Sequence, residues 1–204
     1  RIGAEWLGAK AAEVPDTFCA VIAPTYADVK HTCFEGESGL LNVIPDVLIK
    51  RYNSSDLVLE MKSGTMIRGF TSEKPARLRG PQHEFIWCDE LAAWQNASET
   101  WDMAMMGLRL GKAPQVVWTT TPRPVELVRK LIARRAALEL KSGAVVNLGI
   151  GMPEGVAAVA AEEGVIERLT LTAEPGVIGG IPAGGLSFGA AINAQAVIDQ
   201  PSQF

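Results

Sequence analysis

The segment Phe85-Ile86-Trp87-Cys88-Asp89-Glu90 consists of four apolar residues followed directly by two acids. A short, continuous apolar run is typical of a parallel strand that is covered on both faces. Because parallel α/β sheets bind ligands beyond the carboxyl ends of their strands, the segment predicts that both acids lie at a binding edge. Taken alone, it fits a strand that ends in a solvated acidic turn better than it fits a catalytic site.

The sequence around this segment alternates between predicted strands and helices, which indicates an α/β fold throughout. The elements expected in the first half are parallel strands at Phe18–Pro24 and Gln115–Thr120, an antiparallel hairpin at Leu57–Met61 and Thr65–Phe70, and a helix that Ser98 caps. His31 and His83 are expected on the surface or in polar turns, because no metal-ligand spacing surrounds them.

Residues with matching chemistry flank the two acids. In nucleotide hydrolysis one acid holds magnesium through its water shell, and a second orients or deprotonates the attacking water. Arg77 and Arg79 lie just before the strand, and an arginine near such a site neutralises charge in the transition state. The next strand ends in Thr119-Thr120-Thr121, whose hydroxyls can sense the γ-phosphate.

In this order the motifs resemble the ATPase motor of phage DNA-packaging terminases, the large subunit, over about residues 1–126. The matching stretches are Arg1–Leu7, Cys33–Gly39, Arg77–Gln82, Trp87–Trp94, Thr100–Arg109 and Thr119–Pro124. The roles that the resemblance implies are Walker B magnesium residue for Asp89, catalytic carboxylate for Glu90, coupling motif for Thr119, Thr120 and Thr121, and arginine finger for Arg79. It also implies ATP and Mg²⁺ as cofactors, and phage DNA, the portal and the small terminase subunit as partners.

The resemblance lacks one part of the family's pattern. The phosphate loop, a Gly-rich turn ending Gly-Lys-Thr, would precede the helix that starts at Arg1, and this chain does not contain it. We therefore expect an incomplete P-loop NTPase parallel sheet without appreciable ATP hydrolysis, and we expect both chain ends to be internal to longer proteins.

Composition adds limits on the function classes. A formal net charge of −4 requires any nucleic-acid contact to come from local patches. Three cysteines without metal-ligand spacing indicate reduced thiols in a cytoplasmic protein. No apolar run reaches the roughly 20 residues that a membrane span needs, so no membrane partner is expected.

The second half differs in composition from the first. All five tryptophans lie within residues 1–126, whereas residues 127–204 hold 11 of the 20 glycines. Apolar spacing predicts one helix from Val125 to Leu140, across the junction. The elements expected beyond it are strands at Ala144–Ile150 and Leu169–Ala173 and a helix at Pro153–Glu163. Glu174 follows the last strand, where a carboxylate could form a mixed anhydride with a substrate or could lie in a solvated turn.

This half resembles the acyl-CoA:carboxylate CoA-transferases of the acetate/propionate type, over about residues 127–204. The matching stretches are Ile132–Leu140, Gly143–Gly155, Leu169–Gly189 and Val197–Phe204. The resemblance implies that Glu174 is the nucleophile that carries CoA as a thioester, with acyl-CoA and a carboxylate as substrates. It places Asn147, Gly149 and Gly151 in the wall of the CoA site. Because the match covers a middle slice of the enzyme, an incomplete α/β lobe without transferase activity is expected.

We interpret the chain as two segments, 1–126 and 127–204, joined through rearranged or mis-joined DNA. Three hypotheses follow: a packaging-motor ATPase with transferase sequence attached, a CoA-transferase fragment with a foreign N-terminal stretch, and a non-catalytic chimera. Binding of an ATP analogue favours the first and binding of CoA the second, whereas binding of neither favours the third.

Overall fold

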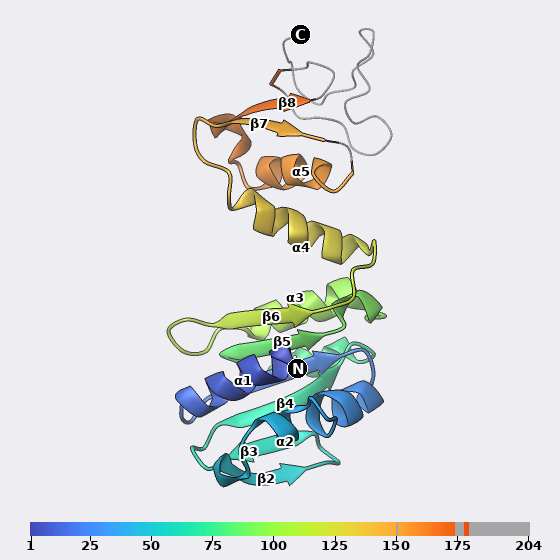
Figure 1. Cartoon of the computed structure of the whole chain (residues 1–204), viewed down its shortest axis with the longest axis vertical. Coiled ribbons are helices and arrows are strands. Elements are labelled where there is room, and N and C mark those ends of the chain that lie inside the picture. Colours follow the sequence, from blue (N-terminus) through green and yellow to red (C-terminus); the bar gives the residue numbers. More distant parts are fainter. Residues whose placement is uncertain (150, 174–177, 180–204) are drawn as a thin grey trace. The chain divides into compact units, whose positions relative to one another are not determined.

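The computed structural model describes residues 1–149, 151–173, 178 and 179, coloured along the chain in Figure 1. The chain divides into two compact units, Arg1–Arg123 and Pro124–Phe204, and each is described by itself. Within the described residues, no helix is long and apolar enough to cross a membrane.

The first unit is built on a six-stranded sheet with the order β2-β3-β4-β1-β5-β6. Its strands are β1 (Phe18–Ala23), β2 (Ile49–Asn53), β3 (Val58–Met61), β4 (Met66–Thr71), β5 (Phe85–Asp89) and β6 (Gln115–Thr119). Strands β4, β1, β5 and β6 run parallel, as expected for the last three. The predicted hairpin is confirmed as the antiparallel pair β3–β4, and β2, which the sequence analysis missed, pairs antiparallel with β3. The sheet is therefore mixed rather than parallel throughout, because short turns can connect only strands of opposite direction.

Three α-helices and several short helical turns connect these strands. They are α1 (Ile2–Glu13), α2 (Leu40–Val43), α3 (Ala97–Gly107), a π-helix at Asp28–Phe34 and 3₁₀ turns at Asp46–Leu48, Pro75–Leu78 and Leu91–Ala93. The predicted cap of α3 is wrong. Its first turn already closes with a bond from the Thr100 amide to the Asn96 carbonyl, so Ser98 lies inside the helix and is exposed.

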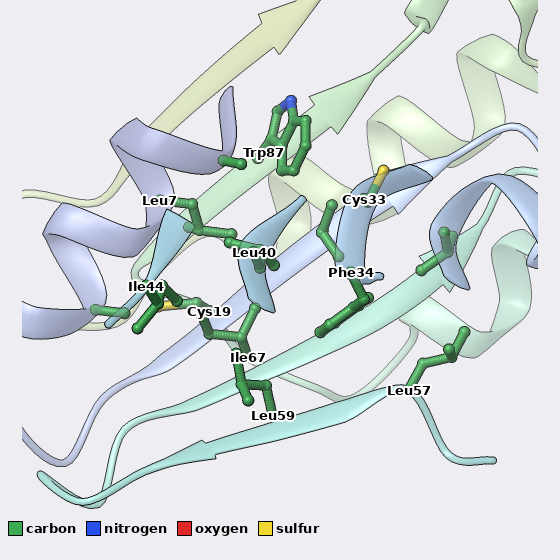
Figure 2. Close-up of a cluster of buried hydrophobic side chains, with 14 of the residues drawn as sticks. Leu7, Cys19, Cys33, Phe34, Leu40, Ile44, Leu57, Leu59, Ile67 and Trp87 are labelled. Carbon is green, nitrogen blue, oxygen red and sulfur yellow. The ribbon is translucent and has the colours of Figure 1, made fainter. Parts of the chain in front are cut away.

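The main core lies between one face of the sheet and the helices α1 and α2. Figure 2 shows side chains from these helices, the π-helix and the strands gathered over that face. Its fully buried large members include Leu7, Phe34, Leu40, Leu59 and Ile67. At roughly 1.5–3 kcal/mol for each large apolar side chain, this burial is the main favourable contribution to folding of the unit.

The opposite face of the central strands is covered as well. Ala20, Ile22, Ile86 and Cys88 alternate with the core residues of β1 and β5 and have no exposed surface. Figure 1 shows α3 on this side of the sheet. Burial on both faces explains why the sequences of β1 and β5 are apolar without alternation.

The second unit has two helices and a parallel strand pair among its described residues. They are α4 (Glu126–Ala137), β7 (Val145–Leu148), α5 (Glu154–Glu162) and β8 (Thr170–Ala173). All four were predicted, with bounds a few residues wider. Arg134 joins the two helices through ion pairs with Glu162 at 2.8 Å and Glu163 at 2.7 Å. A small core of Ala133, Ala137, Leu148, Val156, Ala157, Val159 and Leu171 lies between the helices and the strands.

One expectation about the histidines is wrong. His83 is only 3% exposed, and its ring meets that of Phe70 edge-on, with 5.4 Å between the ring centroids. In the part of the chain that the structure describes, neither of its ring nitrogens has a hydrogen-bond partner. Burial, together with the positive charge of Arg68, lowers the pKa of His83 from its ordinary 6.5 to about 4.

The buried histidine predicts how stability changes with pH. His83 is neutral in the folded state down to about pH 4, but it takes up a proton below about pH 6.5 once unfolded. The unfolded state is therefore favoured as pH falls through this window, by on the order of 2 kcal/mol in total. Tryptophan fluorescence follows unfolding of the first unit alone, since all five tryptophans lie there. His83→Phe, which keeps an aromatic ring against Phe70, should lack this part of the pH dependence.

Tyr26→Phe provides the matched control, because it changes an exposed aromatic residue of the same unit and leaves both histidines in place. It should leave the pH profile of unfolding between pH 6.5 and 4 parallel to that of the wild type. A profile of His83→Phe that also runs parallel to the wild type would contradict the buried, neutral state of His83.

Candidate active site at the ends of β5 and β6

The two predicted acids lie where the strands β5 and β6 end side by side. The strands pair in parallel register from Phe85 opposite Gln115 to Asp89 opposite Thr119. Their carboxyl ends therefore meet at one edge of the sheet, which is the edge where α/β sheets bind ligands. The structure thus brings together the acid pair and the three threonines that the sequence analysis singled out.

Each carboxylate oxygen of Asp89 has a donor from the protein. The Thr119 hydroxyl donates to Oδ1 at 2.7 Å, and the Cys33 thiol of the π-helix donates to Oδ2 at 3.7 Å. Burial raises the pKa of Asp89, as does the charge of Glu90, whereas the Thr119 hydrogen bond lowers it. The threonine therefore helps to keep a partly buried carboxylate in its charged form.

Glu90 adopts a backbone conformation that is rare for its residue type. Its φ of 46° and ψ of 48° lie in the left-handed region, which costs a residue with a Cβ roughly 1–2 kcal/mol. The carboxylate reaches Thr121, whose backbone N–H donates to Oε1 at 2.9 Å and whose hydroxyl lies 3.2 Å from the same oxygen. Strain of this kind in a site residue is a signature of function when the surroundings maintain it.

Thr120 completes the connection between the two strand ends. Its hydroxyl accepts a hydrogen bond from the backbone N–H of Ala92 at 2.9 Å. Thr119 at the end of β6 and the two threonines after it are thus all bonded to the segment from Asp89 to Ala92.

Two tryptophans at the site were missed by the sequence analysis. The indole N–H of Trp87 donates to the Thr119 hydroxyl at 2.9 Å, and that of Trp94 donates to the Asp89 carbonyl at 2.9 Å. A signal for Trp87 was present in the sequence. It lies two residues before Asp89 in a strand and therefore on the same face of the sheet.

Among the described residues, no hydrogen bond or ion pair joins Arg79 to the two acids. Arg77 and Arg79 instead line a cleft of about 980 Å³, together with Arg51 and Arg68 of β2 and β4. Within the described residues, neither Arg77 nor Arg79 has a carboxylate within ion-pair distance. The proposed arginine finger therefore remains a prediction.

The acid pair suits a hard cation that keeps part of its water shell. Magnesium is commonly held through one or two carboxylates and several waters. The described residues contain no cluster of three or more His, Cys, Asp or Glu side chains poised around one metal. Asp89 is half-buried and already oriented by Thr119, so it is the residue whose oxygens fit this role best.

The predicted residues of the second unit are described only in part. Asn147 is an exposed residue of β7, and Gly149 follows the end of that strand. Gly151 has a φ of 96°, which explains a glycine at this turn. The strand β8 ends at Ala173, paired with Leu148, whereas Glu174 lies outside the described residues.

Comparisons with known proteins find two kinds of relative. The family model "Terminase large subunit, T4likevirus-type, N-terminal" matches residues 1–170. The chain is 34% identical to a caffeate CoA-transferase of Acetobacterium woodii over 189 residues, which are 91% of this chain and 35% of that protein. It is 50% identical to the acetate CoA-transferase YdiF of Escherichia coli over 76 residues, which are 37% of this chain and 14% of that protein. The chain thus spans about a third or less of these curated relatives, to which it is homologous.

Matches among solved structures have TM-scores below 0.5. The large terminase ATPase domain of a Thermus phage matches with a TM-score of 0.45 and 14% identity, over 62% of this chain and 56% of that chain. An acyl-CoA transferase of Escherichia coli, in a thioester complex with CoA, matches with a TM-score of 0.27 and 19% identity. That match covers 91% of this chain and 45% of the transferase chain.

The left-handed backbone at Glu90 makes a prediction about stability. Glu90→Gly and Glu90→Ala both remove the carboxylate, but only glycine adopts a positive φ without strain. We expect the glycine variant to be more stable than the alanine variant by about 1 kcal/mol, measured by urea unfolding with tryptophan fluorescence.

The exposed helical residue Glu99 serves as the control, because its backbone lies in the first turn of α3. There the order should reverse, with Glu99→Ala more stable than Glu99→Gly by about 0.5–1 kcal/mol. The same order at both positions would contradict a strained backbone at Glu90.

Proposed function

The chain belongs to the terminase large subunit family, and on this premise we propose that its first unit is the magnesium- and water-binding half of an ATP-hydrolysis site in a DNA-packaging motor. The observation that carries the proposal is the double connection between the strand ends, from Asp89 to Thr119 and from Glu90 to Thr121. Phage DNA, the portal and the small terminase subunit are the partners proposed with this function.

The two acids take different roles in this proposal. Asp89, bonded to Thr119 and Cys33 on its two oxygens, would hold Mg²⁺ through the ion's water shell. The bound ion supplies positive charge that neutralises the phosphate oxygens of ATP. Glu90 leaves the strand through a left-handed backbone, and its carboxylate, held by Thr121, would orient or deprotonate a water.

The threonines after β6 would couple the site to movement. Thr119 and Thr121 contact the two acids directly, and Thr120 contacts the turn that follows them. Loss of the γ-phosphate changes the charge beside both carboxylates. A rearrangement of their hydrogen bonds would then move the end of β6 and the chain that follows it.

Arg79 is proposed as the charge-neutralising arginine. It lies in a cleft with Arg51, Arg68 and Arg77, where basic side chains outnumber the acids Asp56, Glu60 and Glu73. Among the proposed site residues it is the one with the least geometric support.

Metal binding tests the proposal directly. Mn²⁺ replaces Mg²⁺ at oxygen sites and is measured by electron paramagnetic resonance as free and bound ion. We expect saturable binding by the full chain, and a loss of at least tenfold in affinity for Asp89→Asn, because this change removes the charge that attracts the ion.

Asp102→Asn is the matched control, since Asp102 is an exposed carboxylate on α3 of the same unit. It should leave the affinity for Mn²⁺ within about twofold of the wild type, as expected for a screened surface charge. Equal weakening by both substitutions would indicate diffuse attraction and would refute a site at Asp89.

A second candidate function rests on the similarity to CoA-transferases. We propose that residues from about 127 to 204 derive from a CoA-transferase lobe, in which Glu174 is the nucleophile and the turn from Asn147 to Gly151 lies beside the substrate. The 50% identity over 76 residues supports this ancestry. The division of the chain between Arg123 and Pro124 supports a boundary near residue 126.

Mass spectrometry after incubation with acetyl-CoA tests whether this second site is active. A mixed anhydride on Glu174 that CoA attacks would leave a CoA thioester, which hydroxylamine removes. We expect no such adduct, because the chain spans 14–35% of the transferases that it matches. An adduct that the Glu174→Gln variant lacks would overturn this expectation. A chain that binds neither metal nucleotide nor CoA would be a non-catalytic fusion.

A further inference from the structure

Trp87 donates a hydrogen bond to Thr119, which in turn contacts Asp89. The proposed reaction does not explain this bond. The residue is 3% exposed, and its indole N–H donates to the Thr119 hydroxyl at 2.9 Å. In Figure 2 the ring lies at one edge of the core cluster, and its nitrogen points away from the aliphatic side chains. A buried N–H without a partner costs about 1–3 kcal/mol, so this bond contributes to stability as well as to geometry.

The bond from Trp87 determines where the Thr119 hydroxyl points. A threonine hydroxyl has one hydrogen to donate, and two acceptors lie near it: Asp89 Oδ1 at 2.7 Å and the Cys88 carbonyl at 3.5 Å. The indole is a donor only, so it occupies an acceptor lone pair of the hydroxyl and leaves the hydrogen for an oxygen. With that lone pair occupied, the hydrogen lies toward the closer acceptor, the carboxylate of Asp89.

The indole is in turn held by the backbone of α1. A Cβ placed on Gly3 would overlap the indole nitrogen and its neighbouring ring atoms, so the helix contacts the ring edge at this glycine. Gly3 itself is buried. The position of α1 therefore determines the position of the indole, and the indole determines the direction of the Thr119 hydroxyl.

We propose that Trp87 is a positioning residue for Asp89, which transmits the position of α1 through the Thr119 hydroxyl to the carboxylate. Naming Asp89 as the metal-binding carboxylate rests on the proposed function, whereas the relay from Gly3 through Trp87 and Thr119 rests on geometry alone. A displacement of α1 would release the hydroxyl to turn toward Cys88 and would leave Asp89 with one donor fewer.

The relay is tested first without metal, by a double-mutant cycle in unfolding. Trp87→Phe removes the indole N–H, and Thr119→Val removes the hydroxyl while keeping the side chain's shape. If the two groups interact, the urea concentration at the midpoint of unfolding should fall much less in the double variant than the sum of the two single decreases. Additive losses would overturn the relay, whatever the metal measurements give.

The effect on Asp89 is tested by Mn²⁺ affinity. We expect Trp87→Phe and Thr119→Val each to weaken binding by about three- to tenfold, and the double variant to be no weaker than Thr119→Val alone. Thr119→Ser, which keeps the hydroxyl, should bind as the wild type does. Trp101→Phe is the matched control, because it makes the same change on α3, an element outside the relay.

The two readouts separate failure of the relay from failure of the proposed function. Non-additive unfolding with no Mn²⁺ binding in the wild type would leave the relay standing and would refute the metal site. Wild-type Mn²⁺ binding that Trp87→Phe leaves unchanged, or that Trp101→Phe weakens equally, would overturn the assignment of Trp87 as a positioning residue.

Discussion

The parallel pairing of β5 with β6, in register at Asp89 and Thr119, is the constraint on which the rest of the site depends. Side chains alternate along a strand, so a slip of one residue would place Trp118 or Thr120 opposite Asp89 and would remove the bond to its Oδ1. The register is held by burial. Trp87 packs into the core on one face of β5, while Ile86 and its neighbour Cys88 are fully buried on the other.

The sequence predicted the strands that have a continuous apolar run or a clear turn signal. It missed the strand in which apolar and charged residues are mixed. The apolar runs of β1, β5 and β6 and the turn of the β3–β4 hairpin were sufficient to predict their strands. Strand β2 contains Lys50 and Arg51 among half-buried residues, so it carries no apolar run that would have predicted it. The αL backbone at Glu90 has no local signal either, because a glutamate gives no indication of positive φ. Tertiary bonds to Thr121 maintain it.

The similarity to each of the two families extends across the boundary between the two units. The terminase match extends to residue 170, and the longer transferase match covers 91% of the chain, so the two similarities overlap. Packing gives a sharper division than similarity does. The helix α4 lies within the stretch that the terminase model matches, yet its Arg134 pairs with Glu162 of α5 and with Glu163 directly after it.

The backbone strain at Glu90 and the charges of Asp89 and Glu90 are consistent with one physical requirement. The two adjacent carboxylates must act separately. In an extended strand, neighbouring side chains point to opposite faces, which would turn Glu90 away from the edge where Asp89 lies. The left-handed backbone changes that direction, and the two hydrogen-bond donors of Thr121 offset its cost of roughly 1–2 kcal/mol at about 1 kcal/mol each. Asp89 remains partly buried between Thr119 and Cys33. Different threonines at the end of β6 thus hold the two acids, as the proposed division between an ion-binding and a water-binding carboxylate requires.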